Sequence, residues 1–257
     1  MTQLRNIDSS SGSLTARSVV ASTLLGTEPP RLPVRVLVRV GDLFGITEGT
    51  IRTALSRMVA NGELTSADGT YELSGPRLLE RQARQSASRR AMRHVWHGSW
   101  VMAIVVSDRR AADARADLRA ALETARLSEL REGVWLRPDN LNVTWPAVVD
   151  EQCTIVHARD VDPSLVARLW PLGDWADRAN QLRREMADLV EPLERGDTNA
   201  LADGFVVSAA VLRHFQADPL LPEELLPRGW PGTELRTDYD RFDTAYRALL
   251  REYFRIL

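Results

Sequence analysis

Phe44–Gly62, FGITEGTIRTALSRMVANG, decides the fold of the N-terminal part of this chain. Gly45-Ile46 predicts a tight turn, and the hydroxyl of Thr47 can cap the helix that follows it. Asn61-Gly62 favours the left-handed backbone conformation that commonly ends a helix. The stretch therefore predicts the second half of a helix-turn-helix.

The helix within this stretch has two different faces. Apolar residues at helical spacing predict a buried face centred near Leu55, namely Ile51, Ala54, Leu55, Met58 and Val59. The opposite face carries small, hydroxyl-bearing and arginine side chains, which allow close approach to base pairs and contact with guanine edges and phosphates. The candidate DNA-binding residues are Thr47, Thr50, Arg52, Thr53, Ser56 and Arg57, with Gly49 on the same face and Glu48 as its only acid.

The helix alone fits an amphipathic surface helix of any globular domain equally well. Ala67-Asp68-Gly69 then separates two short runs, Glu63–Ser66 and Thr70–Leu73. Asp-Gly between such runs is a strong signal for a β-hairpin. A helix of this kind followed by a hairpin predicts a winged helix and favours DNA binding.

Composition limits the remaining classes. At 257 residues, with 44% hydrophobic and 26% charged residues, the chain predicts two or three globular domains. The single cysteine, Cys153, excludes an internal disulfide and fits a reducing, cytoplasmic location. The sequence contains no run of about 18 apolar residues, so it predicts no membrane-spanning helix. The polar start is expected to be a disordered leader over residues 1–15 and not a secretion signal.

Charge is distributed unevenly along the chain. Residues 1–96 contain 13 arginines and 8 acidic residues, whereas the remainder contains 20 arginines and 27 acidic residues. A basic N-terminal part on an acidic remainder fits a DNA-binding head on a body that does not bind DNA.

Two segments around the predicted turn and hairpin are less certain in type. Pro33–Phe44 contains many β-branched residues, which favour a strand, but its helical spacing and its place before the turn favour a helix. Pro76–Arg93 predicts a polar helix or linker whose arginines either follow phosphates or are simply solvated.

The remainder predicts an α/β domain and a helical domain. Apolar strands at Val101–Val106, Gly133–Pro138 and Gln152–Ala158, with a helix over Asp113–Leu127, indicate a ferredoxin-like sandwich. Helices are expected at Leu165–Leu169, Trp175–Leu193, Ala200–Gln216 and Thr237–Leu257. The fold class is thus α+β, with a leader at 1–15, a winged-helix head at 16–76, a linker helix at 77–94, a ferredoxin-like domain at 95–162 and a helical domain at 163–257.

The chain resembles the PaaX-like family, named for the repressor of bacterial phenylacetate breakdown, from about Arg17 to its C-terminus. The residues that carry the resemblance are Ile51–Val59, Trp96–Trp100, Trp135–Pro138, and Asp218–Pro227 followed by Trp230-Pro231-Gly232. The proline-rich C-terminal signature is the most specific of these.

The resemblance implies a three-domain transcriptional regulator that binds inverted repeats of operator DNA as a homodimer. It also implies release from DNA by an acyl-CoA thioester such as an aryl-acetyl-CoA. Two positions depart from the family pattern. The short wing at Ala67–Thr70 is faintly acidic where basic residues are expected, and His97 stands where an aspartate is often found.

Catalytic chemistry has little support in the sequence. Asp108 follows an apolar strand, near the place where CRISPR-associated nucleases of ferredoxin fold keep a metal-binding aspartate, but it lacks a second clear ligand. His94 and His97 lack a partner pair that would complete a metal site. Cys153 is expected to pack in the core. We therefore expect no catalytic residue, no metal and no cofactor.

The effector site is expected in the region from Trp96 onward, which contains all seven tryptophans. Aromatic side chains could wall a pocket between the middle and C-terminal domains, with polar groups at one end; the alternative is that most of them are core residues. The candidates are Trp96, Trp100, Trp135, Arg137 and His214, together with Trp170 as a further wall residue.

The sequence thus predicts a ligand-responsive repressor of a catabolic operon. The alternatives are an activator without a small-molecule effector, a metal-dependent nuclease, and a winged helix used for protein contact.

Overall fold

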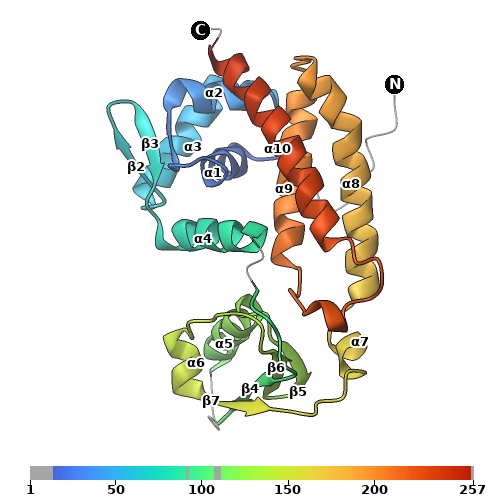
Figure 1. Cartoon of the computed structure of the whole chain (residues 1–257). Helices are drawn as coiled ribbons and strands as arrows, with labels where there is room; N and C mark the ends of the chain where they lie inside the picture. Colours follow the sequence, from blue (N-terminus) through green and yellow to red (C-terminus); the bar gives the residue numbers. More distant parts are fainter. Residues whose placement is uncertain (1–13, 91–92, 107–110, 256–257) are drawn as a thin grey trace. The chain divides into compact units, whose positions relative to one another are not determined.

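The computed structural model describes residues 14–90, 93–106 and 111–255 (Figure 1). Its contacts form two compact units, the first from residues up to 86, 185–210 and 238 onward, and the second from 87–184 and 211–237. The predicted leader falls almost wholly outside the described residues, as does Asp108. The domain boundaries expected from the sequence stay a prediction.

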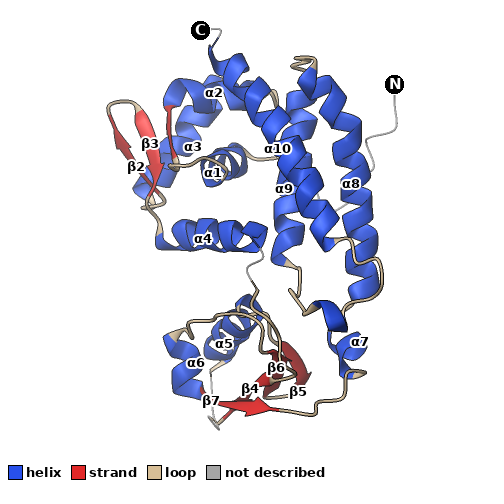
Figure 2. Ribbon diagram, viewed as in Figure 1, coloured by secondary structure: helices blue, strands red, loops and turns tan. Residues whose placement is uncertain are grey.

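The first unit contains a winged helix-turn-helix, as the sequence predicts (Figure 2). Three helices combine with three short antiparallel strands, and β3 is the central strand between β1 and β2. The elements are α1 (Ala16–Leu25), β1 (Arg31–Pro33), α2 (Val34–Asp42), α3 (Glu48–Ala60), β2 (Leu64–Ala67) and β3 (Thr70–Leu73).

The ambiguous segment before the turn is helical, which confirms the choice of helix over strand for α2. Its β-branched residues are accommodated because Leu37 and Val40 lie on the side packed into the core. The strand β1 was not predicted. It has three residues, and its partner β3 lies about 40 residues further along the chain, so no local pattern indicates it.

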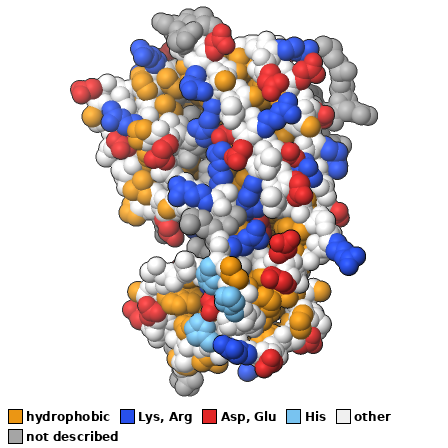
Figure 3. All heavy atoms as spheres, viewed as in Figure 1, with side chains coloured by type: hydrophobic (Ala, Val, Ile, Leu, Met, Phe, Trp, Pro, Cys, Tyr) orange, Lys and Arg blue, Asp and Glu red, His pale blue; other side chains and the backbone are white. Residues whose placement is uncertain are grey.

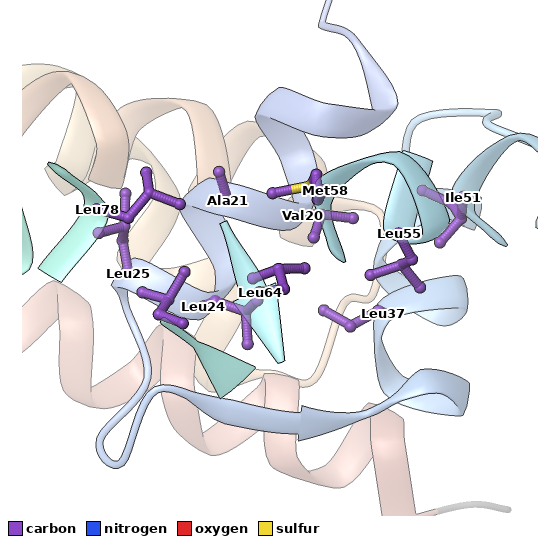
Figure 4. Close-up of a cluster of buried hydrophobic side chains, with 11 residues drawn as sticks. Val20, Ala21, Leu24, Leu25, Leu37, Ile51, Leu55, Met58, Leu64 and Leu78 are labelled. Atoms are coloured by element: carbon purple, nitrogen blue, oxygen red, sulfur yellow. The ribbon is translucent and has the colours of Figure 1, made fainter. Parts of the chain in front are cut away.

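The core of the head lies between its three helices and its sheet (Figure 4). Leu24, Ile51 and Leu55 have no exposed surface, and Met58 and Leu37 are each 1% exposed. Each such side chain stabilises the fold by about 1.5–3 kcal/mol through apolar burial. This core holds α3 by one face only.

One residue that the apolar pattern of α3 predicts to be buried is exposed in the structure. Val59 is 36% exposed, whereas Ile51, Leu55 and Met58 are buried. At about 100° per residue, Val59 lies near the edge of the apolar stripe, which explains its exposure.

The segment after the wing forms a helix, α4 (Pro76–Arg90). The sequence leaves a polar helix and a linker as alternatives, and the helix is confirmed. Leu78 joins the core of the head, and the Gln82 side chain donates to the Thr27 carbonyl at 3.2 Å. The first part of α4 therefore belongs to the packed head.

The second unit contains a four-stranded antiparallel sheet in the order β5-β6-β4-β7. The chain order βαββαβ with this sheet order is the ferredoxin-like arrangement, as predicted. The elements are β4 (Trp100–Val105), α5 (Ala112–Thr124), β5 (Ser128–Arg131), β6 (Val134–Pro138), α6 (Ala147–Gln152) and β7 (Cys153–Ala158). The sequence did not predict β5 or α6, because β5 is a short polar edge strand with a bulge and α6 has only six residues.

Alternate residues of the sheet pack into two different cores. Ala103, Trp135 and Cys153 face α5 and α6, so Cys153 is a core residue. Trp100 and Leu136 face the opposite way. That second face is covered by α7 (Leu165–Leu169), the start of α8 (Leu172–Glu194) and the segment 221–230.

The C-terminal region is helical, as predicted. Beyond α7 and α8 it contains α9 (Ala200–Gln216), a short 3-10 helix (Glu223–Leu225) and α10 (Gly232–Arg255). The predicted bounds match α7 and α9, whereas α10 begins five residues before the predicted Thr237. None of the described helices has the length and hydrophobicity needed to cross a membrane.

Candidate nucleic-acid interface

The turn between α2 and α3 fixes the direction of α3. Gly45 has a φ of +66°, which favours glycine, and the Gly41 carbonyl accepts from the amides of Phe44 and Ile46 at 3.0 Å each. Gly41 also faces Ile51 across the two helices, and a Cβ built on Gly41 would lie 2.7 Å from Cγ1 of Ile51. The two helices can therefore approach this closely only with glycine at position 41.

Both ends of α3 are closed by specific hydrogen bonds. At the N-terminus, Thr47 Oγ1 accepts from the Thr50 amide at 3.4 Å and lies 2.9 Å from Thr50 Oγ1. At the C-terminus, Gly62 has a φ of +70° and its amide donates to Val59 at 2.9 Å. These caps match the predicted start and end of the helix.

The candidate DNA-binding residues lie together on the exposed side of α3. The core contacts of Ile51, Leu55 and Met58 turn the opposite side of the helix toward solvent. The exposed residues on and beside that side are Thr47, Glu48, Gly49, Thr50, Arg52, Thr53, Ser56 and Arg57. We call this set the α3 surface.

The two arginines of the α3 surface differ in their partners. Arg52 Nε lies 2.7 Å from Glu48 Oε1, one helical turn earlier, and both side chains are more than half exposed. Such a surface pair contributes only about 0.3–0.5 kcal/mol, so a phosphate can replace the carboxylate at little cost. Within the described part of the chain, the Arg57 side chain has no ion pair or hydrogen bond, and its guanidinium is available to a ligand.

The hydroxyls of the α3 surface are already oriented by the helix backbone. Thr53 Oγ1 donates to the Gly49 carbonyl at 2.8 Å, and Ser56 Oγ donates to the Arg52 carbonyl at 3.0 Å. Each hydroxyl proton is therefore used within the helix, while the oxygen lone pairs remain free to accept. In a major groove such oxygens match the amino groups of adenine and cytosine.

The wing is short and anchored at its tip. Asp68 and Gly69 have φ values of 49° and 72°, which form the two-residue turn predicted from Asp-Gly. The Val34 amide donates to the Gly69 carbonyl at 2.8 Å, which ties the tip to the start of α2. The exposed Asp68 carboxylate at the tip repels phosphate. On the other flank, α4 exposes Arg81 and Arg84, and Arg84 lies 3.9 Å from Glu80.

The effector candidates lie on the two opposite sides of the ferredoxin-like sheet. Trp96 and Trp100 contact each other edge to face at 6.2 Å on one side of the ferredoxin-like sheet, where Trp170 also packs. Trp135 and Arg137 lie on the opposite side, because β6 pairs Val101 with Arg137 and Ala103 with Trp135.

His214 is connected to the first of these sides, because Trp230 packs against the cluster that contains Trp100. It stacks on Trp175 at 4.4 Å, and Trp175 stacks on Trp230 at the same distance. Burial lowers the pKa of His214, and the hydrogen bond of its Nε2 with the Trp175 carbonyl acts in the opposite direction. The candidates therefore do not line one common pocket.

The residues that hold the C-terminal signature in place were missed at the level of sequence. Asp218 is 3% exposed, pairs with Arg236 at 2.8 Å and accepts from the Leu220 amide at 2.9 Å. The Asn140 side chain donates to the Leu220 carbonyl, and Arg93 donates to the Leu221 carbonyl. The signature thus connects the ferredoxin-like domain to the first residues of α10, all of them within the second unit.

Within the described residues, no group of three histidine, cysteine, aspartate or glutamate side chains could hold a metal ion. His94 and His97 are both exposed, and Asp108 lies outside the described residues.

Comparison with known proteins agrees with this architecture. A family model described as "PaaX-like protein" matches residues 15–76, and one described as "PaaX-like protein C-terminal domain" matches residues 170–256. A solved structure, uncharacterized protein Rv0674 from Mycobacterium tuberculosis, is 41% identical, covers 94% of this chain and 99% of its own, and superposes with a TM-score of 0.74. A search of curated proteins found no match. The chain therefore belongs to the PaaX-like family, whose members are transcriptional regulators that bind DNA.

Proposed function

We propose that this protein is a ligand-responsive repressor of a catabolic operon, which binds double-stranded operator DNA as a homodimer through α3. The observation that carries the proposal is the α3 surface itself. A closely packed core holds the helix by one face, and the other face presents hydroxyls, a glycine and two arginines to solvent.

Each polar side chain of this surface has a distinct role in the proposal. Arg57, which has no partner among the described residues, donates to O6 and N7 of a guanine. Arg52 exchanges Glu48 for a backbone phosphate. Thr53 and Ser56 accept from base amino groups, because their protons are held by the helix.

The N-terminal end of α3 contributes to positioning. Thr47 and Thr50 share a short contact at 2.9 Å, and both are exposed at the first turn. A helix N-terminus attracts phosphate through its free amides and its dipole, so these two residues position the helix on the DNA backbone.

Dimerisation follows from the geometry of operator recognition. A single helix reads only a few base pairs, and two-fold related copies read an inverted repeat whose half-sites lie about one helical turn or a multiple of it apart. A regulator of this kind acts on chromosomal DNA and so in the cytoplasm.

The effector class in the proposal is an acyl-CoA thioester such as an aryl-acetyl-CoA, as the family resemblance implies. Such a ligand releases DNA only if it binds more tightly to a dimer whose two α3 helices no longer match the operator spacing. An activator without an effector is the competing reading. PaaX-like regulators are generally not enzymes, and we propose no catalytic activity.

The test is selection of bound fragments from the source genome with the purified protein. We expect enriched fragments that contain an inverted repeat upstream of catabolic genes, and retention that falls steeply with salt. Adding aryl-acetyl-CoA should then release the fragments, whereas an activator without an effector would keep them. If the protein retains no fragment even at low salt, the DNA-binding proposal is wrong, and the remaining alternative is a winged helix that contacts another protein.

A further inference from the structure

A cavity of about 350 Å³ lies on the ferredoxin-like unit, on the side of the sheet that carries Trp135. It is bounded by strands β4, β6 and β7 and by the loop that follows β6. Its apolar wall consists of Val101, Val143, Trp145 and Ile155. Histidine side chains gather on the visible face of this unit (Figure 3), and His94 and His157 line the cavity.

The cavity is also lined by a buried cation, Arg137, which is 2% exposed. Its Nη1 donates to the Pro138 carbonyl at 2.6 Å and its Nη2 to the Leu141 carbonyl at 3.1 Å, while Nε has no hydrogen-bond partner among the described residues. Burial lowers the pKa of the guanidinium, and the Asp139 carboxylate acts in the opposite direction. Arginine nevertheless keeps its charge in proteins.

Within the described part of the chain, Arg137 lacks the direct ion-pair partner that buried charges usually have. No carboxylate of the described residues forms an ion pair with it. Asp139, which also lines the cavity, instead contacts His157, with its Oδ2 3.2 Å from Nδ1. By contrast, the partly buried Arg236 of the same unit pairs directly with buried Asp218 at 2.8 Å.

We propose that this cavity binds a small organic acid, whose carboxylate neutralises Arg137 and whose short apolar part packs against Val143, Trp145 and Ile155. Arginine binds carboxylates through paired hydrogen bonds, which suits a planar anionic head. The volume is at the small end of ligand pockets, which span about 300–1,000 Å³. A whole coenzyme A thioester is too large for it, so the acid is a second ligand class beyond the thioester of the proposed function.

The first test is calorimetric titration of the full-length protein with benzoate and hexanoate, and with their neutral amides. We expect the acids to bind at least tenfold more tightly than the amides. Arg137→Gln should weaken binding of the acids at least tenfold, whereas Arg159→Gln, a change at an exposed arginine just after β7, should leave it unchanged. Equal binding of acids and amides, or full binding by Arg137→Gln, would overturn the proposal.

Arg137 also donates hydrogen bonds to two backbone carbonyls, so Arg137→Gln could disturb the fold as well as the cavity. A second variant therefore tests the cavity independently. Thr144 is exposed and lines the cavity, so Thr144→Trp should fill it without touching the guanidinium and should weaken acid binding at least tenfold. Retained binding would show that the acid does not occupy this cavity. Retention of operator DNA is measured separately. A protein that binds the acid but does not retain operator DNA would contradict only the proposed function. A protein that retains operator DNA but does not bind the acid would contradict only this inference.

Discussion

Replacing Gly41 with alanine tests whether the contact between α2 and α3 holds the α3 surface in place. The added Cβ would lie 2.7 Å from Cγ1 and 2.9 Å from Cδ1 of Ile51, and 3.3 Å from the Ile46 carbonyl oxygen. Ile51 has no exposed surface, so its side chain cannot swing outward to make room. The helices must therefore move apart or the isoleucine must leave its preferred rotamer.

The expected cost follows from two opposing effects. Overpacking a buried site costs about 1–3 kcal/mol. Alanine recovers about 0.5–1 kcal/mol over glycine in a helix. The net loss for Gly41→Ala therefore lies between about 0 and 2.5 kcal/mol, and its middle value of about 1.3 kcal/mol corresponds to a roughly 9-fold increase in local opening.

Hydrogen exchange measured by peptide mass spectrometry reports this opening for each segment of the chain. Amides of α3 should exchange about tenfold faster in Gly41→Ala, and peptides from β4 to β7 should be unchanged. The matched control is Gly49→Ala, in α3 itself, where an added Cβ meets nothing within 4 Å and exchange should not accelerate. Unchanged exchange in Gly41→Ala would refute the argument that this glycine sets the position of α3.

Three further predictions concern other parts of the fold. Arg236→Ala leaves the buried Asp218 carboxylate without its ion-pair partner, so the free energy of unfolding should fall by about 3 kcal/mol in urea titrations; no loss would show that the pair is not stabilising. Because burial lowers the pKa of His214, the unfolded chain binds a proton at this residue first as pH falls below about 6.5, and the free energy of unfolding should decrease toward pH 5. The decrease should be smaller than the roughly 1.4 kcal/mol per pH unit of one fully coupled proton, because the side chain is partly exposed to solvent. His214→Gln should lessen that pH dependence, and an identical pH profile would contradict it. Gly69→Ala places a side chain at a φ of 72°, and thermal melts should show a loss of about 1 kcal/mol, whereas an unchanged melting temperature would mean that the turn has relaxed.

The head could be predicted from the sequence because its signals are local. A cap at Thr47, apolar residues three and four positions apart, and Asp68-Gly69 each indicate a structure within a few residues. The strands β1 and β5 escaped prediction because each is three or four residues long, and their pairing with β3 and β6 gives them their conformation. Their existence depends on contacts that no local window contains.

The effector candidates illustrate a second limit. Aromatic composition grouped Trp100 with Trp135, yet the sheet separates them because Val101, and not Trp100, pairs with Arg137. Strand alternation places Trp135 and Arg137 on one side, and this much could be read from the sequence. The register between β4 and β6, which decides where Trp100 lies, could not.

The buried signature around Asp218 shows a third limit. Its resemblance to a family pattern was visible, but its physical role depends on Arg236, Asn140 and Arg93, up to 128 residues away. Leu220 within it has a φ of 54°, which an ordinary side chain rarely adopts and which no local residue preference indicates.

The most direct test of the account is the affinity of Arg57→Ala for the selected operator, measured by fluorescence anisotropy at fixed salt. If Arg57 reads a guanine, the variant should lose about 1–3 kcal/mol, or roughly 5- to 150-fold, on the operator and much less on unrelated DNA. Arg159→Ala, which removes an exposed arginine outside the head, should bind as the unchanged protein does. An Arg57→Ala variant that binds the operator with full affinity would contradict the claim that the α3 surface reads DNA.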